Sequence, residues 1–150
     1  MAEKLILTRK AWQAMRRHVS RRLPLEACGL LAGKNGRVES AFGIYNAERS
    51  AVRFRMEPRA QWRAFQCIEA AGLDLVGIYH SHPNGPDRPS PTDIAECMYP
   101  VAQVILFRVG GRWRGRGFQI EGGKVTELPL EFLTSPLLTE KTIFTTKDTK

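Results

Sequence analysis

The segment "GIYHSHPNGPDRPSPTD", residues 77–93, contains two of the three histidines in the chain. His80 and His82 are separated only by Ser81, and residues two apart in a strand point to the same side. Both imidazoles could therefore converge on one zinc ion, for which Zn–N distances are about 2.0–2.1 Å. The alternative is two loop histidines that decorate a turn. The pair alone does not decide between a metal site and a turn.

Asp93 ends the same segment and also has two interpretations. Ser90-Pro91-Thr92-Asp93 has Ser at an N-cap position, Pro at the first helical position and an acid three residues after the cap, which is the arrangement of a capping box. Such a cap needs no metal. Because a helix N-terminus also fixes the direction of a carboxylate, Asp93 could be a third, oxygen ligand and leave a fourth position for water. The two interpretations are compatible.

The spacing of these residues resembles a known family. H-S-H followed by seven residues, Ser, two residues and Asp is the pattern of the JAMM (MPN, Mov34) metalloproteases, and it matches His80, His82, Ser90 and Asp93. The family also has a glutamate on an early strand, and "PLEACGLLAG" is similar to its surroundings, which indicates Glu26. "YNAERSAVRFRMEP" further resembles the segment between these motifs in short prokaryotic members.

The resemblance implies a role for each of the five residues. His80, His82 and Asp93 would bind Zn²⁺, which lowers the pKa of its bound water toward about 7 and polarises the scissile carbonyl. Glu26 would act as the general base that takes the proton of this water and delivers it to the departing amine. Ser90 would donate a hydrogen bond to the oxyanion. Without the resemblance, Glu26 would be a surface glutamate before a strand.

The resemblance also implies a substrate class. Family members cleave amide or isopeptide bonds after the C-terminal Gly-Gly of ubiquitin-like proteins, and 150 residues leave little room for the insertions of eukaryotic members. The chain is more similar to the small bacterial and archaeal members that release an amino acid or a peptide from a sulfur-carrier protein. An extended tail would suit a groove where it pairs with a strand edge. The chain could also form a homodimer.

Three other functions remain open. The first is a phage-tail, cell-wall-linked or other JAMM peptidase without a carrier partner. The second is a non-catalytic MPN scaffold, although such members usually lose the metal ligands that this chain keeps. The third is a nucleic-acid-associated role, which the net charge of +8 permits. Because no nucleic-acid-binding motif accompanies the arginine clusters, this partner is not favoured. An acidic carrier protein would also suit a basic surface, and we expect some of the arginines near the groove.

The elements that position the site follow from local patterns. Thr8 is a plausible cap for a helix that ends before Pro24, and Pro58 suits the first turn of a second helix. We expect helices at 9–22, 58–72 and 92–98, and strands at 26–33, 37–46, 51–57, 73–80 and 101–110, with one or two more at 112–130. This order predicts an α/β protein of the α+β type, with a mixed, largely antiparallel sheet flanked by helices. The resemblance implies the JAMM/MPN (cytidine-deaminase-like) fold.

The composition indicates one cytoplasmic domain. We expect a catalytic domain at 1–133 and a flexible or docking tail at 134–150. No apolar run approaches the roughly 20 residues of a membrane span, and no signal peptide is recognisable. The three cysteines form no C-x-x-C pair, which favours a reducing compartment. Cys97 lies one helical turn after Asp93, but we expect it and Cys28 in the core and His18 exposed.

Overall fold

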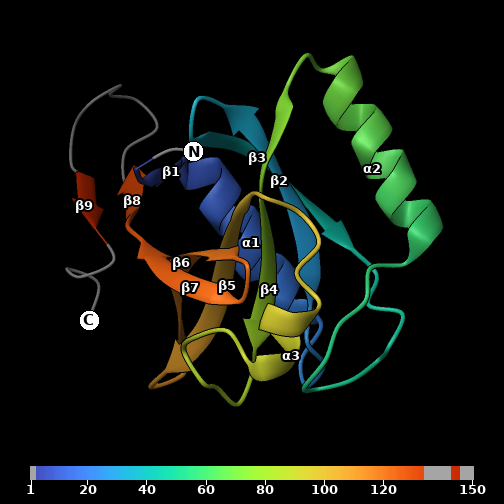
Figure 1. Ribbon diagram of the computed structural model, residues 1–150, viewed down its shortest axis with the longest axis vertical. Helices are drawn as coiled ribbons and strands as arrows, with labels where there is room; N and C mark the ends of the chain where they lie inside the picture. Colours follow the sequence, from blue (N-terminus) through green and yellow to red (C-terminus); the bar gives the residue numbers. More distant parts are fainter. Residues whose placement is uncertain (1–2, 134–142, 146–150) are drawn as a thin grey trace.

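The computed structural model describes residues 3–133 and 143–145, which form one nine-stranded sheet with three helices (Figure 1). The elements are β1 Leu5–Leu7, α1 Arg9–Arg21, β2 Cys28–Lys34, β3 Arg37–Ile44, α2 Pro58–Ala70, β4 Asp74–His82, α3 Pro91–Ala95, β5 Ala102–Val109, β6 Arg112–Glu121, β7 Lys124–Leu128, β8 Leu130–Leu133 and β9 Ile143–Thr145. The strand order is β7-β6-β5-β4-β2-β3-β1-β8-β9. Only β1 with β3, β1 with β8, and β4 with β5 are parallel pairs. The predicted mixed, largely antiparallel sheet is therefore confirmed.

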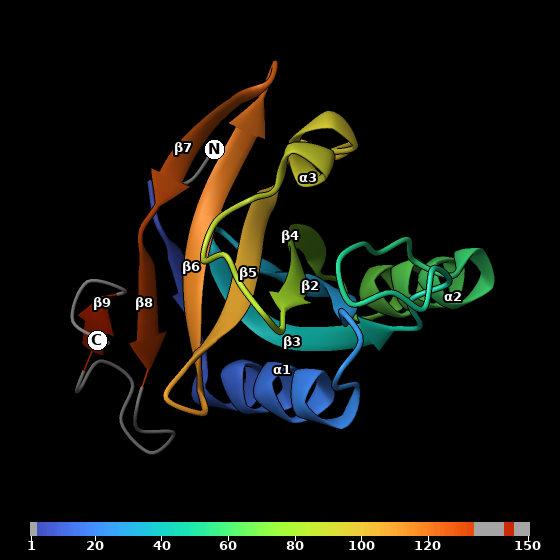
Figure 2. The same ribbon diagram turned by 90° about the horizontal axis from the view of Figure 1, so that it is seen from below.

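Helix α1 packs against one face of this sheet. The side chain of Thr8 caps it by accepting a hydrogen bond from the amide of Ala11 (3.2 Å). Ala11, Met15 and Val19 recur every four residues, are at most 1% exposed and share an apolar cluster with Tyr79 of β4. Figure 2 shows α1 below the sheet, away from α3. This apolar stripe holds the sheet face opposite the histidines in place.

A second apolar cluster fills the other face, under α2. Ala64 and Ile68 of α2 contribute to it, and so does Ile78 of β4. Because successive strand residues alternate between faces, Ile78 belongs to this cluster while Tyr79 belongs to the cluster under α1. The same alternation places His80 and His82 on the α2 face, where β4 reaches α3 (Figure 1).

The strand predicted at 51–57 is wrong. Only an isolated bridge between Asn46 and Met56 is present there. The side chain of Asn46 instead donates to the carbonyl of Arg53 (2.9 Å) and accepts from the amide of Arg55 (3.0 Å). The alternation of apolar and basic residues imitates a strand, but the Asn46 side chain satisfies two of the backbone groups that a neighbouring strand would otherwise bond.

The ends of the sheet also differ from the prediction. β1, β8 and β9 lie together at one edge, and no local pattern had indicated the first of them. One or two antiparallel strands were expected in 112–130, and two are present there, β6 and β7. Within the expected tail, β9 pairs with β8, and the rest of that tail lies outside the described residues. In the part of the chain that is described, no helix is long and apolar enough to cross a membrane.

Candidate metal centre

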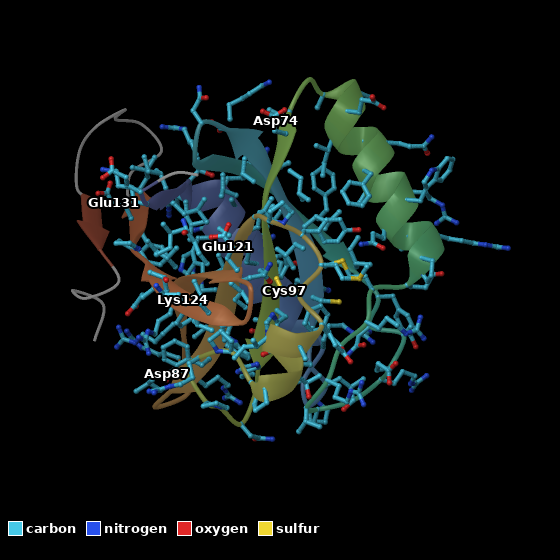
Figure 3. All side chains as sticks on the ribbon, in the orientation of Figure 1. Asp74, Asp87, Cys97, Glu121, Lys124 and Glu131 are labelled. Atoms are coloured by element: carbon cyan, nitrogen blue, oxygen red, sulfur yellow. The ribbon has the colours of Figure 1, made fainter. Side chains whose placement is uncertain are left out.

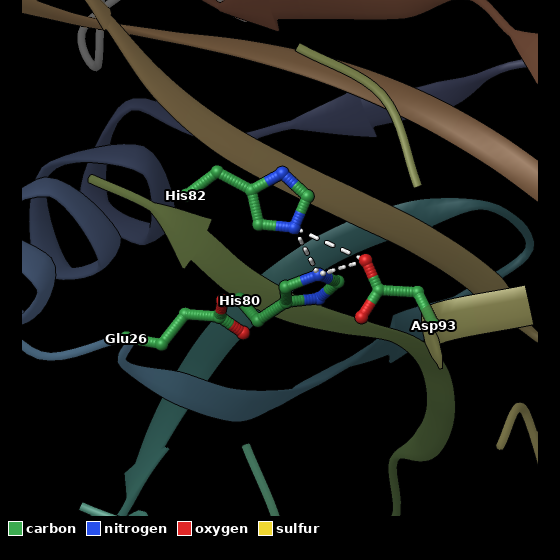
Figure 4. A group of neighbouring side chains, drawn as sticks. All are labelled: Glu26, His80, His82 and Asp93. Carbon is green, nitrogen blue, oxygen red and sulfur yellow. Dashed lines mark hydrogen bonds and ion pairs between the residues drawn. The ribbon is translucent and has the colours of Figure 1, made fainter. Parts of the chain in front are cut away.

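The end of β4 and the start of α3 bring three predicted ligands together (Figure 4). His80 Nε2 and His82 Nε2 are 3.1 Å apart, and each is 3.1 Å from Asp93 Oδ2. Glu26, just before β2, completes a group in which one potential ligand atom from each of the four residues lies within 4.8 Å of the others. Both histidines are at most 4% exposed. The cluster is therefore a compact, largely buried set of nitrogen and oxygen donors.

The geometry of the triangle fits a divalent cation. In a tetrahedral site with zinc–ligand distances of about 2.0–2.1 Å, neighbouring ligand atoms lie about 3.3–3.4 Å apart, close to the 3.1 Å seen between His80, His82 and Asp93. Hydrogen bonds alone do not satisfy this triangle, because a neutral imidazole has one N–H and the carboxylate has none. One cation satisfies all three atoms together.

The environment of the cluster shifts the pKa values of His80, His82 and Asp93. Burial lowers the pKa of His80. Burial acts in the same direction on His82, but hydrogen bonds to Asp93 and to the Pro86 carbonyl outweigh it and raise the His82 pKa. Burial alone would raise the pKa of Asp93, but its hydrogen bonds to the two histidines hold that pKa well below the ordinary range. Asp93 therefore stays ionised, as a metal ligand must.

Asp93 caps α3 and also lies in the candidate metal cluster. The Ser90 hydroxyl oxygen accepts from the amide of Asp93 (3.0 Å), and the amide of Ser90 donates to Asp93 Oδ2 (2.9 Å). This is the predicted capping box, with Pro91 at the first helical position. The oxygen that completes the cap also faces the histidines, so the helix cap aims the carboxylate.

Two groups that the sequence reasoning missed orient the cluster. His82 Nδ1 donates to the carbonyl of Pro86 (2.7 Å), which leaves Nε2 facing the cluster. Ser81 Oγ accepts from the amide of Ala27 (2.8 Å) and ties the end of β4 to the start of β2, beside Glu26. A signal existed for Ser81, because the middle residue of H-x-H must point away from the histidines. None existed for Pro86, which acts through its backbone.

Glu26 is the most unusual group of the site. Its side chain is only 2% exposed, and among the described residues Oε1 has no hydrogen-bond partner. Its backbone is held on both sides. The Glu26 amide donates to the carbonyl of Ser50 (2.8 Å), and the Glu26 carbonyl accepts from the side-chain amide of Asn46 (3.0 Å). Burial raises the pKa of Glu26 to about 8. A carboxyl that exchanges its proton near neutral pH is suited to acid–base chemistry, and a surface position is ruled out.

A cavity of about 630 Å³ opens onto the triangle. Phe54 stacks on the His80 ring at one side, with 4.5 Å between the ring centroids, and Tyr99 lines the cavity as well. An ion pair between Arg53 and Glu96 (3.1 Å) joins the segment before α2 to the end of α3. The cavity thus gives an extended chain a partly apolar path to the two ligands that line it, His80 and Asp93.

The remaining sequence candidates lie outside the cluster. Cys97 is half-buried on the cavity wall rather than in the core, with Sγ 3.8 Å from the Gln103 amide nitrogen, so that expectation is wrong (Figure 3). His18 is not exposed as expected, because its Nδ1 is hydrogen-bonded to the Tyr79 hydroxyl on the opposite face (2.7 Å). Cys28 is fully buried in the apolar cluster under α2, as expected.

The chain is similar to prokaryotic proteins that are named as a protease and a peptidase. It is 38% identical over 109 residues to a probable TtuB-protein conjugate cleaving protease of Thermus thermophilus, covering 72% of this chain and 73% of that one. It is 36% identical over 130 residues to the CysO-cysteine peptidase of Mycobacterium tuberculosis, covering 84% and 89%. Both alignments span most of each chain.

Solved structures and a family model agree with this likeness. A Desulfitobacterium hafniense protein matches with a TM-score of 0.79 and 31% identity over 87% of this chain and 94% of that one. A JAB1/MPN domain protein of Archaeoglobus fulgidus has the same fold, with a TM-score of 0.57 and 16% identity over 87% and 98%. The model for prokaryotic homologs of the JAB domain matches residues 8–119. The chain therefore belongs to the prokaryotic JAB-domain family of JAMM/MPN proteins.

Proposed function

We propose that the chain is a zinc-dependent peptidase that hydrolyses the amide or isopeptide bond after the C-terminal Gly-Gly of a ubiquitin-like or sulfur-carrier protein. The observation that carries this proposal is the buried Glu26 carboxyl beside the triangle of His80, His82 and Asp93. A non-catalytic scaffold would have no use for a buried, unpaired carboxyl at a metal cluster, because burying it costs free energy.

His80, His82 and Asp93 are the proposed zinc ligands. Their donor set of two imidazoles and one carboxylate matches that of catalytic zinc sites, which keep one position open. When bound, Zn²⁺ supplies Lewis-acid polarisation of a carbonyl and lowers the pKa of water. The protein contributes the orientation of the ligands, through the Ser90 cap on Asp93 and the Pro86 carbonyl on His82.

Glu26 and Ser90 are the proposed catalytic groups. Glu26 takes a proton from the attacking water as the new C–O bond forms, and it delivers that proton to the amine as the C–N bond breaks. A pKa raised to about 8 by burial suits both transfers. Ser90 accepts the capping bond through Oγ and still has its own hydroxyl hydrogen, which we assign to the oxyanion.

The cavity supports a substrate with an extended, slender C-terminal tail. Arg53 and Glu96, which form an ion pair, both line this cavity, and so does Phe54, which stacks on His80. We propose that the tail passes between these groups to the cluster. Glycines, which have no side chain, would pass such a path most easily. The similar proteins from Thermus and Mycobacterium are named for cleaving TtuB conjugates and CysO-cysteine, which supports a carrier protein as the partner and the cytoplasm as the location.

Part of the basic charge lies where such a partner would bind. Arg53 and Arg55 line the cavity, although each pairs with an acid, Glu96 and Glu48 respectively. The arginines of α1 belong to the helix on the opposite face of the sheet. We propose that an acidic carrier approaches the cavity side of the protein and that the arginines of α1 have no part in cleavage.

The experiment measures zinc content and cleavage together. The purified protein is incubated with a sulfur-carrier protein extended by one or more residues beyond Gly-Gly, alongside the Glu26→Ala and His82→Ala variants. We expect about one zinc per chain and cleavage after Gly-Gly in the wild type, zinc without cleavage in Glu26→Ala, and neither in His82→Ala. A wild type that binds no zinc and leaves every amide intact would refute the proposal, and cleavage by Glu26→Ala would refute the assigned base.

A further inference from the structure

The loop between β4 and α3 is fastened to a distant strand by one guanidinium. We propose that Arg116 of β6 is a positioning residue, which holds Asp87 and, through the adjacent Pro86 carbonyl, sets the orientation of the His82 ring. This inference rests on the proposed function, because His82 is proposed there as a zinc ligand.

One hydrogen bond links His82 to the loop. Its Nδ1 lies 2.7 Å from the carbonyl oxygen of Pro86. A carbonyl can only accept, so Nδ1 carries a hydrogen, and Nε2 faces Asp93 Oδ2, 3.1 Å away. Hydrogen bonds of this kind fix the tautomer and ring plane of metal-binding histidines. The position of the Pro86 carbonyl therefore decides where Nε2 points.

The loop that carries this carbonyl has few contacts with the rest of the fold among the described residues. Residues 83–89 are rich in Pro and Gly and form neither helix nor strand. Gly85 bonds back to the carbonyl of His82 (3.0 Å) and Arg88 bonds Asp87 (3.1 Å), but both contacts are local. Among the described residues, the bond from Arg116 Nη1 to Asp87 Oδ2 (2.8 Å) is the only one that joins this loop to a strand other than β4. Asp87 is labelled in Figure 3.

Arg116 is itself held in place by several contacts. Its Nε and Nη2 atoms donate to the two carboxylate oxygens of Glu127 on β7 (3.0 and 2.8 Å), and its guanidinium lies over the Phe118 ring. Its side chain is 24% exposed, so these charged bonds are partly shielded from water. The strand register places His80, Ile105 and Arg116 in one row across β4, β5 and β6. Arg116 thus connects the metal-binding face of the sheet to the loop above it.

The test compares three variants with a matched control. Asp87→Asn, Arg116→Gln and the double variant all break the contact. Arg114→Gln removes an arginine two residues away on the same strand, one that has no acidic partner among the described residues. Zinc affinity is measured by competition with a chromophoric chelator, and the nitrogen shifts of the His82 ring are measured by NMR in the zinc-free protein.

We expect Asp87→Asn and Arg116→Gln each to weaken zinc binding by about 10-fold, the lower end of the range for groups behind a metal ligand. The double variant should be no weaker than either single variant, because both act through one contact. Arg114→Gln should stay within about 2-fold of the wild type. The His82 shifts should lose the pattern of a hydrogen held on Nδ1 in the three variants only.

Three results would overturn the inference. The first is zinc affinity and His82 shifts in the variants that equal those of the wild type. The second is a loss of affinity that adds in the double variant, and the third is a loss that follows a fall in the thermal midpoint, which would indicate general destabilisation. Asp87 is on a partly exposed loop, so Asp87→Asn keeps the test valid if Arg116→Gln fails to fold. If the wild type binds no zinc, the proposed function fails, but the His82 shifts still test the positioning role.

Discussion

The two faces of β4 use the same alternation of residues for opposite purposes. On the α1 face, Tyr79 bonds His18 (2.7 Å) and Ser81 bonds the amide of Ala27 (2.8 Å), so each buried polar side chain has a partner. On the other face, Glu26 Oε1 and His80 Nδ1 are buried without a hydrogen-bond partner among the described residues. One face stabilises the fold, and the other retains groups that destabilise the metal-free protein.

The difference shows how burial can serve either stability or chemistry. Burial lowers the pKa of His18 to about 4, so the ring stays neutral and remains a stable partner for Tyr79. Burial raises the pKa of Glu26 to about 8, which keeps a proton available near neutral pH. An unpaired buried polar group costs about 1–3 kcal/mol. Such a cost is expected at a functional site and not in a structural core.

The largest effect is expected from Glu26→Gln, on the face of β4 that carries the candidate metal cluster. The amide has nearly the same shape but cannot accept the proton of water, so cleavage should fall by about 10²–10⁴-fold. Zinc content should equal that of the wild type, because His80, His82 and Asp93 are unchanged. Steady-state cleavage of an extended carrier protein and metal analysis of the same samples check this. Retention of more than a tenth of the activity would contradict the role of Glu26.

Ser90→Ala should separate chemistry from capping. It removes the proposed oxyanion donor, which should lower kcat by about 10²–10³-fold, and an N-cap worth about 1 kcal/mol. Thr8→Ala is the matched control, because it removes the N-cap of α1 on the opposite side of the sheet. Thr8→Ala should lose a similar free energy of unfolding in urea and keep its kcat. Equal kcat values for the two variants would show that Ser90 only caps the helix.

Tyr79→Phe should lower the stability of the protein without affecting the site, because Tyr79 lies on the α1 face of β4. The change leaves His18 Nδ1 buried without its partner, and the free energy of unfolding should fall by about 1–3 kcal/mol. Cleavage and zinc content should be unchanged, because the Tyr79 hydroxyl points away from the cluster. Urea unfolding followed by tryptophan fluorescence gives the stability, and a change of more than about 3-fold in kcat would mean that the two faces are coupled.

The smallest effect is a dependence of stability on pH with opposite signs for the two faces. The pKa of His18 is lowered from 6.5 to about 4, so its contribution is complete above pH 6.5 and is lost as the pH falls toward 4. The pKa of Glu26 is raised from 4.5 to about 8, so its contribution is complete below pH 4.5 and is lost as the pH rises toward 8.

The two changes cancel between pH 4.5 and pH 6.5, so the free energy of unfolding of the zinc-free protein should be flat there. It should decline by roughly 1–2 kcal/mol from pH 6.5 to pH 8, and by less than about 1 kcal/mol from pH 4.5 to pH 4. Urea unfolding between pH 4 and pH 9 measures both declines. Glu26→Gln should abolish only the alkaline decline, and Tyr79→Phe should leave that decline intact. An alkaline decline that persists in Glu26→Gln would assign it to another group.

Local patterns were sufficient for much of this protein. The spacing of His80, His82 and Asp93 predicted their convergence, because strand alternation and a helix cap both act over a few residues. Helices α1 and α2 were predicted for the same reason, through Thr8 and Pro58. The catalytic roles of the site residues stay predictions. The pattern in 51–57 misled because a strand also needs a neighbour, and Asn46 occupies that place.

Only the tertiary structure decided how deep the site lies and what holds it. Glu26 is buried next to a contact between Ala27 and Ser81, which are 54 residues apart. The bond from Arg116 to Asp87 spans 29 residues and two intervening strand pairings. The sequence alone determined which groups could do the chemistry, because residue type and short spacing are local properties. Their desolvation and alignment are properties of the packed sheet, since they arise from residues that meet only on folding.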